Sequence, residues 1–125
     1  MNQRITLIVA ALMGAVTVVL GASGAHSLKP LLTELGKTDT FELANRYQFF
    51  HVIAMLITAL LMNFHASKLL QWASLSFLVG VICFSGSLYA MCFIHMKALG
   101  PVTPLGGLFF IAGWVMLALG ISNKK

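Results

Sequence analysis

Three of the four histidines lie in or beside apolar segments, where an ionisable side chain raises the question of a functional site. They are His26, His51 and His95. If the three side chains converged, their ring nitrogens could bind a metal ion or a haem iron. The sequence offers no ligand pair at short spacing and no acidic second shell, so we expect no metal and no other cofactor. Alternatively, each neutral imidazole donates one hydrogen bond, accepts another, and ties helix ends together.

His51 belongs to a stripe of residues spaced four, three and four apart, namely Tyr47, His51, Ala54 and Thr58. This spacing places the stripe on one face of a helix, so His51 is expected to point into a helix bundle and not at lipid. A polar group in that position needs a partner. The candidates are Gln48 on the same helix and His26 or Tyr89 from other helices.

The sequence gives little support for chemistry beyond hydrogen bonding. No nucleophile with a paired base and no pair of acids can be placed in the apolar segments, so an enzyme is not expected. These segments also lack the Asp or Glu that commonly couples protons to transport. A small transporter or channel is the second hypothesis, and its pocket would be lined by His26, Tyr47, Gln48, His51 and Tyr89.

The composition indicates a chain whose solvent is lipid. Of 125 residues, 59% are hydrophobic and 9% are charged, far from the balance of a soluble domain. The net charge of +5 comes from basic residues scattered at the ends of the apolar segments. That pattern is typical of membrane-flanking charges and excludes a nucleic-acid surface.

The apolar segments predict an all-α, integral-membrane four-helix bundle forming one domain over residues 1–125. The approximate spans are 5–25, 43–64, 72–95 and 104–121, with an interfacial loop or short helix between the first two. Four spans place both termini on the same side of the membrane. The basic residues divide evenly between the two surfaces, and the distance of Lys37 from a span end tips the prediction towards cytoplasmic termini.

This topology brings most of the unusual polar residues to one membrane surface. The predicted polar cluster consists of His26, Arg46, Tyr47, Gln48, His51, Ser85, Tyr89, His95 and Thr103. Arg46 follows Glu42 by four residues, and this spacing favours a salt bridge on one helical face. Thr103 precedes Pro104, a pair typical of a helix start.

Small residues recur at helical spacing and predict where helices approach one another closely. The predicted packing glycines are Gly14, Gly21, Gly24, Gly80, Gly86, Gly106, Gly113 and Gly120. In lipid, close approach of backbones replaces the hydrophobic drive between helices. We expect the contacts within one bundle, and the alternative is a seam between copies of the chain.

Four motifs occur in order along the chain: G-A-S-G-A-H-S-L-K from Gly21, R-Y-Q-F-F-H from Arg46, F-S-G-S-L-Y from Phe84 and V-T-P-L-G-G from Val102. Together they resemble the YgdD/YwdK-like family of small bacterial inner-membrane proteins of unknown function. The resemblance implies four membrane helices in the cytoplasmic membrane and supplies no substrate or catalytic residue. The favoured interpretation is a non-enzymatic structural or interaction bundle.

Overall fold

The computed structural model describes residues 1–123, and this part of the chain is all-helical, without a β-strand. The predicted all-α class is therefore confirmed for these residues. The elements are α1 (Gln3–Ala25), α2 (Lys29–Leu35), α3 (Thr38–Leu61), α4 (Lys68–Gly80), the π-helix η1 (Val81–Ser85), α5 (Gly86–Phe93), the 3-10 turn η2 (Lys97–Leu99) and α6 (Val102–Ser122).

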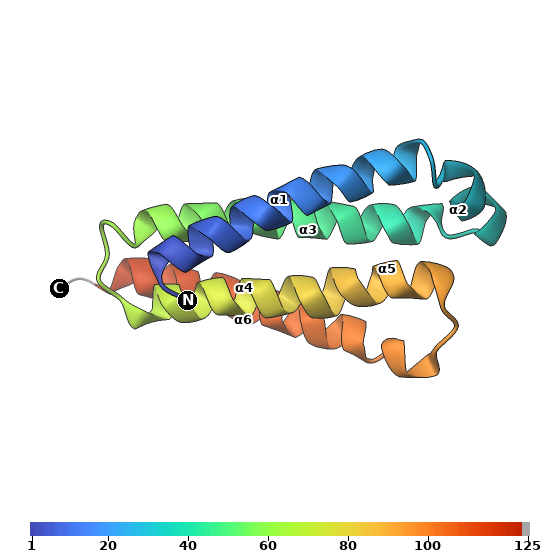
Figure 1. Ribbon diagram of the computed structural model, residues 1–125. Coiled ribbons are helices and arrows are strands. Elements are labelled where there is room, and N and C mark those ends of the chain that lie inside the picture. Colours follow the sequence, from blue (N-terminus) through green and yellow to red (C-terminus); the bar gives the residue numbers. More distant parts are fainter. Residues whose placement is uncertain (124–125) are drawn as a thin grey trace.

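The long helices lie side by side in an elongated bundle (Figure 1). α1 crosses α3 obliquely, while α4, η1 and α5 follow one another as a single rod with α6 beside it. α1 begins and α6 ends at the same end of the bundle, where the amino group of Met1 donates to the carbonyl of Gln71 (2.8 Å). α2 and η2 lie at the opposite end, so α2 is the short helix expected between the first two long ones.

Local signals explain where several helices begin and end. Asn2 caps α1 by accepting from the N–H of Ile5 (2.9 Å), and Ser67 caps α4 by accepting from the N–H of Leu69 (3.2 Å). α2 begins with a proline in its first turn and ends at Gly36, whose φ of 67° is a left-handed conformation that glycine adopts readily. The sequence therefore sets sharp ends for this short helix.

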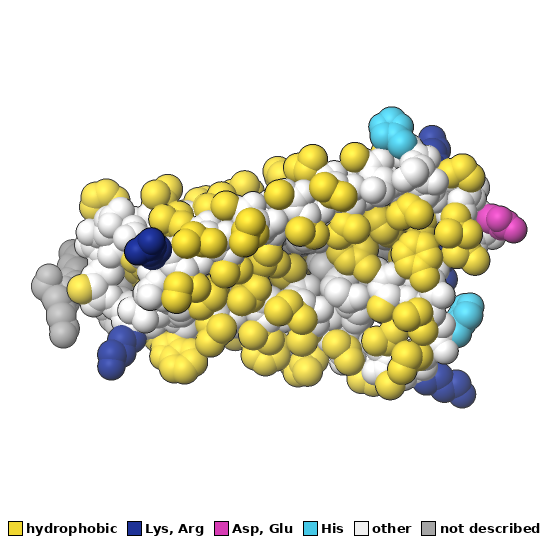
Figure 2. All heavy atoms as spheres, in the orientation of Figure 1, with side chains coloured by type: hydrophobic (Ala, Val, Ile, Leu, Met, Phe, Trp, Pro, Cys, Tyr) yellow, Lys and Arg dark blue, Asp and Glu magenta, His cyan; other side chains and the backbone are white. Residues whose placement is uncertain are grey.

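Three helical segments of the described chain are long and apolar enough to cross a membrane, Gln3–Ala25, Lys68–Phe93 and Lys97–Ser122. Helix α3, which contains the predicted span 43–64, is not among them because its first half carries carboxylates, an arginine and side-chain amides. On the face seen in Figure 2, charged side chains gather at the two ends and a broad hydrophobic band separates them. This distribution suits a bilayer around the middle of the bundle.

The interior contains two hydrophobic clusters. The larger is built around Met55, Leu70 and Phe77, which are fully buried where α3, α4 and α6 meet. The smaller lies at the α2 end, where Leu32 and Phe41 pack with Cys92. Large apolar side chains remain exposed along the outside of the helices, as expected where lipid is the solvent.

Glycines bring α6 against the rod formed by α4 and η1. A Cβ added to Gly106 would overlap the backbone nitrogen of Phe84, and one added to Gly80 would overlap the ring of Phe110. A Cβ on Gly113 would stand 2.6 Å from the ring of Phe77, and one on Gly120 would stand 2.9 Å from Leu70. At each of these glycines, atoms of the same chain occupy the space that a Cβ would need.

The glycines of α1 face α3. A Cβ on Gly24 would overlap the ring of Phe41, one on Gly21 would stand 3.0 Å from Oδ1 of Asn45, and one on Gly14 would make an ordinary 3.6 Å contact with Val52. Gly86 differs from the other predicted packing glycines, because a Cβ there would have nothing within 4 Å. It follows the π-helical turn η1 and is exposed, whereas Gly80 is buried, so the two glycines lie on different faces of the rod.

Candidate functional site

His51 is enclosed by aromatic rings between α3 and α6. Its imidazole is 5% exposed and stacks on Phe110, with ring centroids 3.6 Å apart and planes 8° apart. Nδ1 lies 2.8 Å from the backbone oxygen of Tyr47, and the indole Nε1 of Trp114 donates to Nε2 across 3.1 Å. Both ring nitrogens therefore have partners inside the protein.

These two bonds determine the protonation of the ring. An indole N–H only donates, so Nε2 of His51 must accept from Trp114. A carbonyl oxygen only accepts, so Nδ1 must carry the proton that it donates to Tyr47. The imidazole is neutral in this arrangement, and neither nitrogen has a free lone pair to offer a metal.

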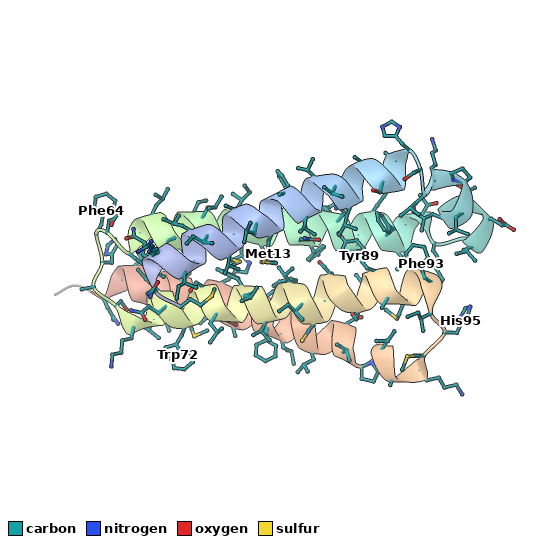
Figure 3. The ribbon with its side chains drawn as sticks, viewed as in Figure 1. Met13, Phe64, Trp72, Tyr89, Phe93 and His95 are labelled. Atoms are coloured by element: carbon teal, nitrogen blue, oxygen red, sulfur yellow. The ribbon has the colours of Figure 1, made fainter. Side chains whose placement is uncertain are left out.

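A second polar network joins three helices. The hydroxyl of Tyr89 on α5 donates to Oε1 of Gln48 (2.7 Å), and Nδ2 of Asn45 donates to the same hydroxyl (3.1 Å). Figure 3 shows Tyr89 lying between the α5 rod and α3. Asn45 also donates to the backbone oxygen of Thr17 on α1 (3.0 Å), so the network links α1, α3 and α5.

Sequence reasoning did not single out Asn45. A signal was available, since Asn45 precedes Gln48 by three residues and so shares its helical face. The connection to Tyr89, 44 residues later, became visible only when the helices were placed together.

Hydroxyl groups make further links between helices. Ser85, which is 1% exposed on η1, donates to the carbonyl of Ala44 on α3 (2.7 Å). Ser87 on α5 shares a hydrogen bond with Thr103. Thr103 is not a helix cap as its position before proline suggests, because α6 already begins at Val102. Its hydroxyl instead joins α6 to α5.

The structure does not unite all the predicted cluster residues. His51 lies 13 residues after the start of α3, about 20 Å along the helix, and so is near mid-bundle instead of at a membrane surface. His26 follows the end of α1, and His95 lies between α5 and η2; both are exposed (Figure 3 labels His95). Within residues 1–123, no group of three His, Cys, Asp or Glu side chains is placed to hold a metal ion.

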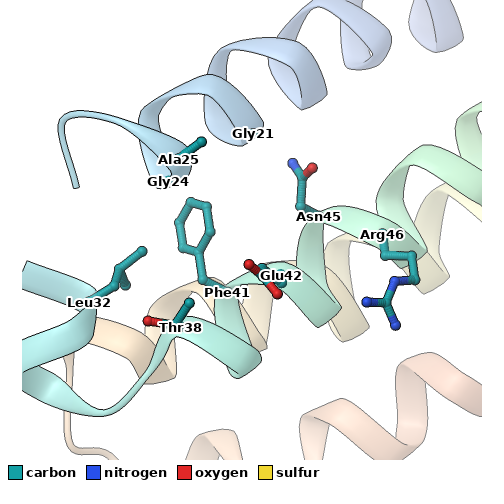
Figure 4. A pocket seen from close by; sticks show the side chains of 9 residues that line it. All are labelled: Gly21, Gly24, Ala25, Leu32, Thr38, Phe41, Glu42, Asn45 and Arg46. Carbon is teal, nitrogen blue, oxygen red and sulfur yellow. The ribbon is translucent and has the colours of Figure 1, made fainter. Parts of the chain in front are cut away.

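Arg46 lies apart from the hydrogen-bonded networks. Its side chain is exposed and lines a cleft of about 260 Å³ between α1, α2 and the first half of α3. Figure 4 shows its guanidinium group away from the carboxylate of Glu42, in contrast to the salt bridge that the spacing favours. Of the residues predicted to line a transport pocket, none lines this cleft.

The buried polar side chains of the described residues all have hydrogen-bond partners. No buried side-chain nitrogen or oxygen atom of residues 1–123 lacks a hydrogen-bond partner. Some bond to a carbonyl one turn earlier in their own helix, as Thr17 and Thr58 do. Others cross to a neighbouring helix, as Ser76 does by donating to the carbonyl of Phe109 on α6 (2.6 Å). The second group binds helices to each other.

Comparison with known proteins identifies the family. Residues 20–107 match the family described as "Protein of unknown function (DUF423)". Over 127 residues the chain is 38% identical to the UPF0382 inner membrane protein YgdD of Escherichia coli K12, covering 100% of this chain and 95% of the relative. A UPF0382 membrane protein of Haemophilus influenzae is 38% identical over 124 residues, covering 99% and 97% of the two chains.

A UPF0382 membrane protein of Staphylococcus aureus is 36% identical over 117 residues, which are 94% of each chain. No solved structure matches the chain. The resemblance based on the four motifs is thus confirmed. The chain belongs to the DUF423 (UPF0382) family of multi-pass bacterial membrane proteins, whose relatives include inner-membrane proteins.

Proposed function

We propose that this protein is a non-enzymatic structural or interaction bundle of four membrane helices, and that its polar side chains lock those helices together. The observation that supports this most directly is that every buried side-chain nitrogen and oxygen atom in residues 1–123 has a hydrogen-bond partner. His51 uses both of its nitrogens, and Tyr89 both donates and accepts, all within the chain.

Hydrogen bonds between helices contribute to helix association in a bilayer. Because acyl chains are as apolar as leucine, helices in a bilayer associate through close packing and interhelical hydrogen bonds. Each such bond contributes about 0.6 kcal/mol on average and up to about 1.7 kcal/mol. The hydrogen bonds from Asn45, Ser76 and Ser85 to carbonyls of other helices act alongside the glycine contacts.

The fourth span in this proposal is α3. Its 24 residues extend about 36 Å, more than the roughly 30 Å of a hydrocarbon core. In its polar first half, Asn45, Gln48 and the carbonyl of Ala44 form hydrogen bonds with α1, α5 and η1 respectively. With α3 spanning, both termini share one side, which we propose is the cytoplasm.

Labelling of single cysteines will test this topology. Cys83 and Cys92 are first replaced by alanine, and cysteine is then introduced at the exposed positions Ser27, Ala66 or Asn123. In spheroplasts, an impermeant maleimide is expected to label Ser27→Cys and to spare the other two. Inverted vesicles should give the reverse. If Ala66→Cys and Ser27→Cys label from the same side, α3 does not cross the membrane.

Removing the hydroxyl of Tyr89 will test the locking role. Tyr89→Phe breaks the link between Asn45 and Gln48 and leaves Oε1 of Gln48 without a donor. We expect the free energy of unfolding in mixed micelles to fall by about 1–2 kcal/mol.

Tyr47→Phe is the matched control, because the Tyr47 hydroxyl makes no hydrogen bond within the described residues and its ring is 37% exposed. This variant should unfold like the wild type. A loss of stability in Tyr89→Phe no greater than in Tyr47→Phe would contradict the locking role and leave Tyr89 free for a ligand.

A further inference from the structure

The α1–α3 cleft is a built cavity at the α2 end of the bundle (Figure 4). It has a volume of about 260 Å³ and is lined by Gly21, Gly24, Ala25, Leu32, Thr38, Phe41, Glu42, Asn45 and Arg46. Its α1 wall is formed by Gly21, Gly24 and Ala25, and a Cβ added at Gly21 would stand 3.0 Å from Oδ1 of Asn45. Opposite this wall, α3 presents an amide, a carboxylate and a guanidinium.

The amide of Asn45 is held in a fixed orientation. Nδ2 donates to the carbonyl of Thr17, which can only accept. The nitrogen and oxygen positions of the amide therefore cannot be exchanged. Oδ1 is therefore the amide atom next to Gly21, and both residues line the cleft. No donor in the described chain bonds to this oxygen, although Nδ2 has two partners. A fixed acceptor without a partner in an open cleft suits a ligand that donates hydrogen bonds.

Glu42 and Arg46 add one negative and one positive charge to the same cleft. They are one helical turn apart on α3, both are exposed, and Figure 4 shows their charged groups apart. A guanidinium binds phosphate through paired N–H groups, and a carboxylate accepts from an ammonium group. The cleft thus presents complementary charges to a ligand that carries both signs.

The size and the remaining lining limit the ligand further. Pockets that enclose drug-sized ligands measure about 300–1,000 Å³, so about 260 Å³ has room for a headgroup but not for whole acyl chains. Leu32 and Phe41 form an apolar floor. A membrane lipid fits both conditions, because its headgroup can enter while its chains stay in the bilayer.

We propose that the α1–α3 cleft binds one zwitterionic phospholipid with a primary ammonium headgroup, such as phosphatidylethanolamine. Arg46 holds the phosphate, and the ammonium group donates to Glu42 and to Oδ1 of Asn45. Phosphatidylcholine lacks the N–H donors, and phosphatidylglycerol lacks the positive charge. The site shares Asn45 with the network of Tyr89 and Gln48, whereas Glu42 and Arg46 belong to neither hydrogen-bonded network, so variants of these two residues test the site apart from the locking role.

Native mass spectrometry of the full chain, with each of these three lipids added to delipidated protein in detergent, will test the proposal. Phosphatidylethanolamine should bind about tenfold more tightly than the other two, since a hydrogen bond to a charged group is worth about one power of ten in affinity. Equal binding of the three lipids, or a preference for phosphatidylglycerol, would overturn the assignment.

Single substitutions in the cleft test whether the lipid binds there. Arg46→Gln should weaken phosphatidylethanolamine about tenfold, and Glu42→Gln should abolish the preference over phosphatidylcholine. Lys29→Gln is the matched control, because Lys29 is an exposed cation at the same end and does not line the cleft. Unchanged binding in both cleft variants, or an equal loss in Lys29→Gln, would place the lipid elsewhere. All three should keep the unfolding midpoint of lipid-free protein, which separates this test from that of the locking role.

Water-soluble phosphoethanolamine is the second probe, since it carries the same charges without acyl chains. It should bind far more weakly than the lipid. Binding as tight as that of the lipid would show that the cleft takes a soluble zwitterion and would overturn the assignment to a membrane lipid.

Discussion

Replacing Gly106 with alanine is expected to lower the free energy of unfolding by about 3 kcal/mol, the upper part of the range for overpacking. The added Cβ would overlap the backbone nitrogen of Phe84 and also meet its Cα and Cβ. A flexible side chain could turn aside, but the backbone of η1 can yield only if α6 moves away. Such a movement would also disturb the neighbouring contact of Gly80 with Phe110.

The adjacent Gly107 is a matched control. A Cβ at Gly107 would have nothing within 4 Å, so Gly107→Ala should be neutral or add up to about 1 kcal/mol through helix propensity. Unfolding in mixed micelles titrated with SDS and followed by circular dichroism will measure both variants. Equal stabilities of the two variants would show that α6 does not pack against η1 through Gly106.

Replacing His51 with alanine is expected to cost about 2–3 kcal/mol of unfolding free energy, from two lost hydrogen bonds and the cavity left beside Phe110. The change also leaves the indole N–H of Trp114 without an acceptor in the lipid region. In a Trp72→Phe background, Trp114 is the single tryptophan, and its fluorescence emission should change when its hydrogen bond to His51 is lost.

A double-mutant cycle isolates the contact. His51→Ala and Trp114→Phe should couple by about 1 kcal/mol, within the range of touching residues. His26→Ala and His95→Ala are controls, since both side chains are exposed and should change stability by less than about 0.5 kcal/mol. Zero coupling would show that the His51–Trp114 bond does not form.

The spacing of residues along one helix predicts which side chains face the interior of the bundle. Gly106 and Gly113 are seven residues apart, and this spacing alone indicated a packing face because a straight helix returns to nearly the same side after two turns. His51 was placed inside the bundle by the same periodicity. The pattern carries no information about the opposing helix, however, so the partners named for His51 did not include Trp114, 63 residues later.

The rod of α4, η1 and α5 shows a different limit. The π-helical turn at Val81–Ser85 inserts one extra residue into the helical turn. A periodicity of 100° per residue assumes a regular α-helix and therefore assigns the wrong faces to the residues that follow this turn. Ser85 is almost completely buried there against Ala44 of α3, whereas the next residue, Gly86, faces open space. The backbone hydrogen-bonding of this turn depends on the helices packed around it.

The sequence by itself determined that this is a helical membrane protein of a recognisable bacterial family, because composition, helical periodicity and short motifs are all local properties. Only the tertiary structure decided how the polar residues divide. His51 lies in an aromatic contact near mid-bundle, where it accepts from Trp114. Tyr89 and Gln48 form a hydrogen-bonded network with Asn45. Arg46 lines an open cleft. The reason is physical: a hydrogen bond requires two groups within about 3 Å, and the rotation and depth of each helix against its neighbours fix which groups come that close.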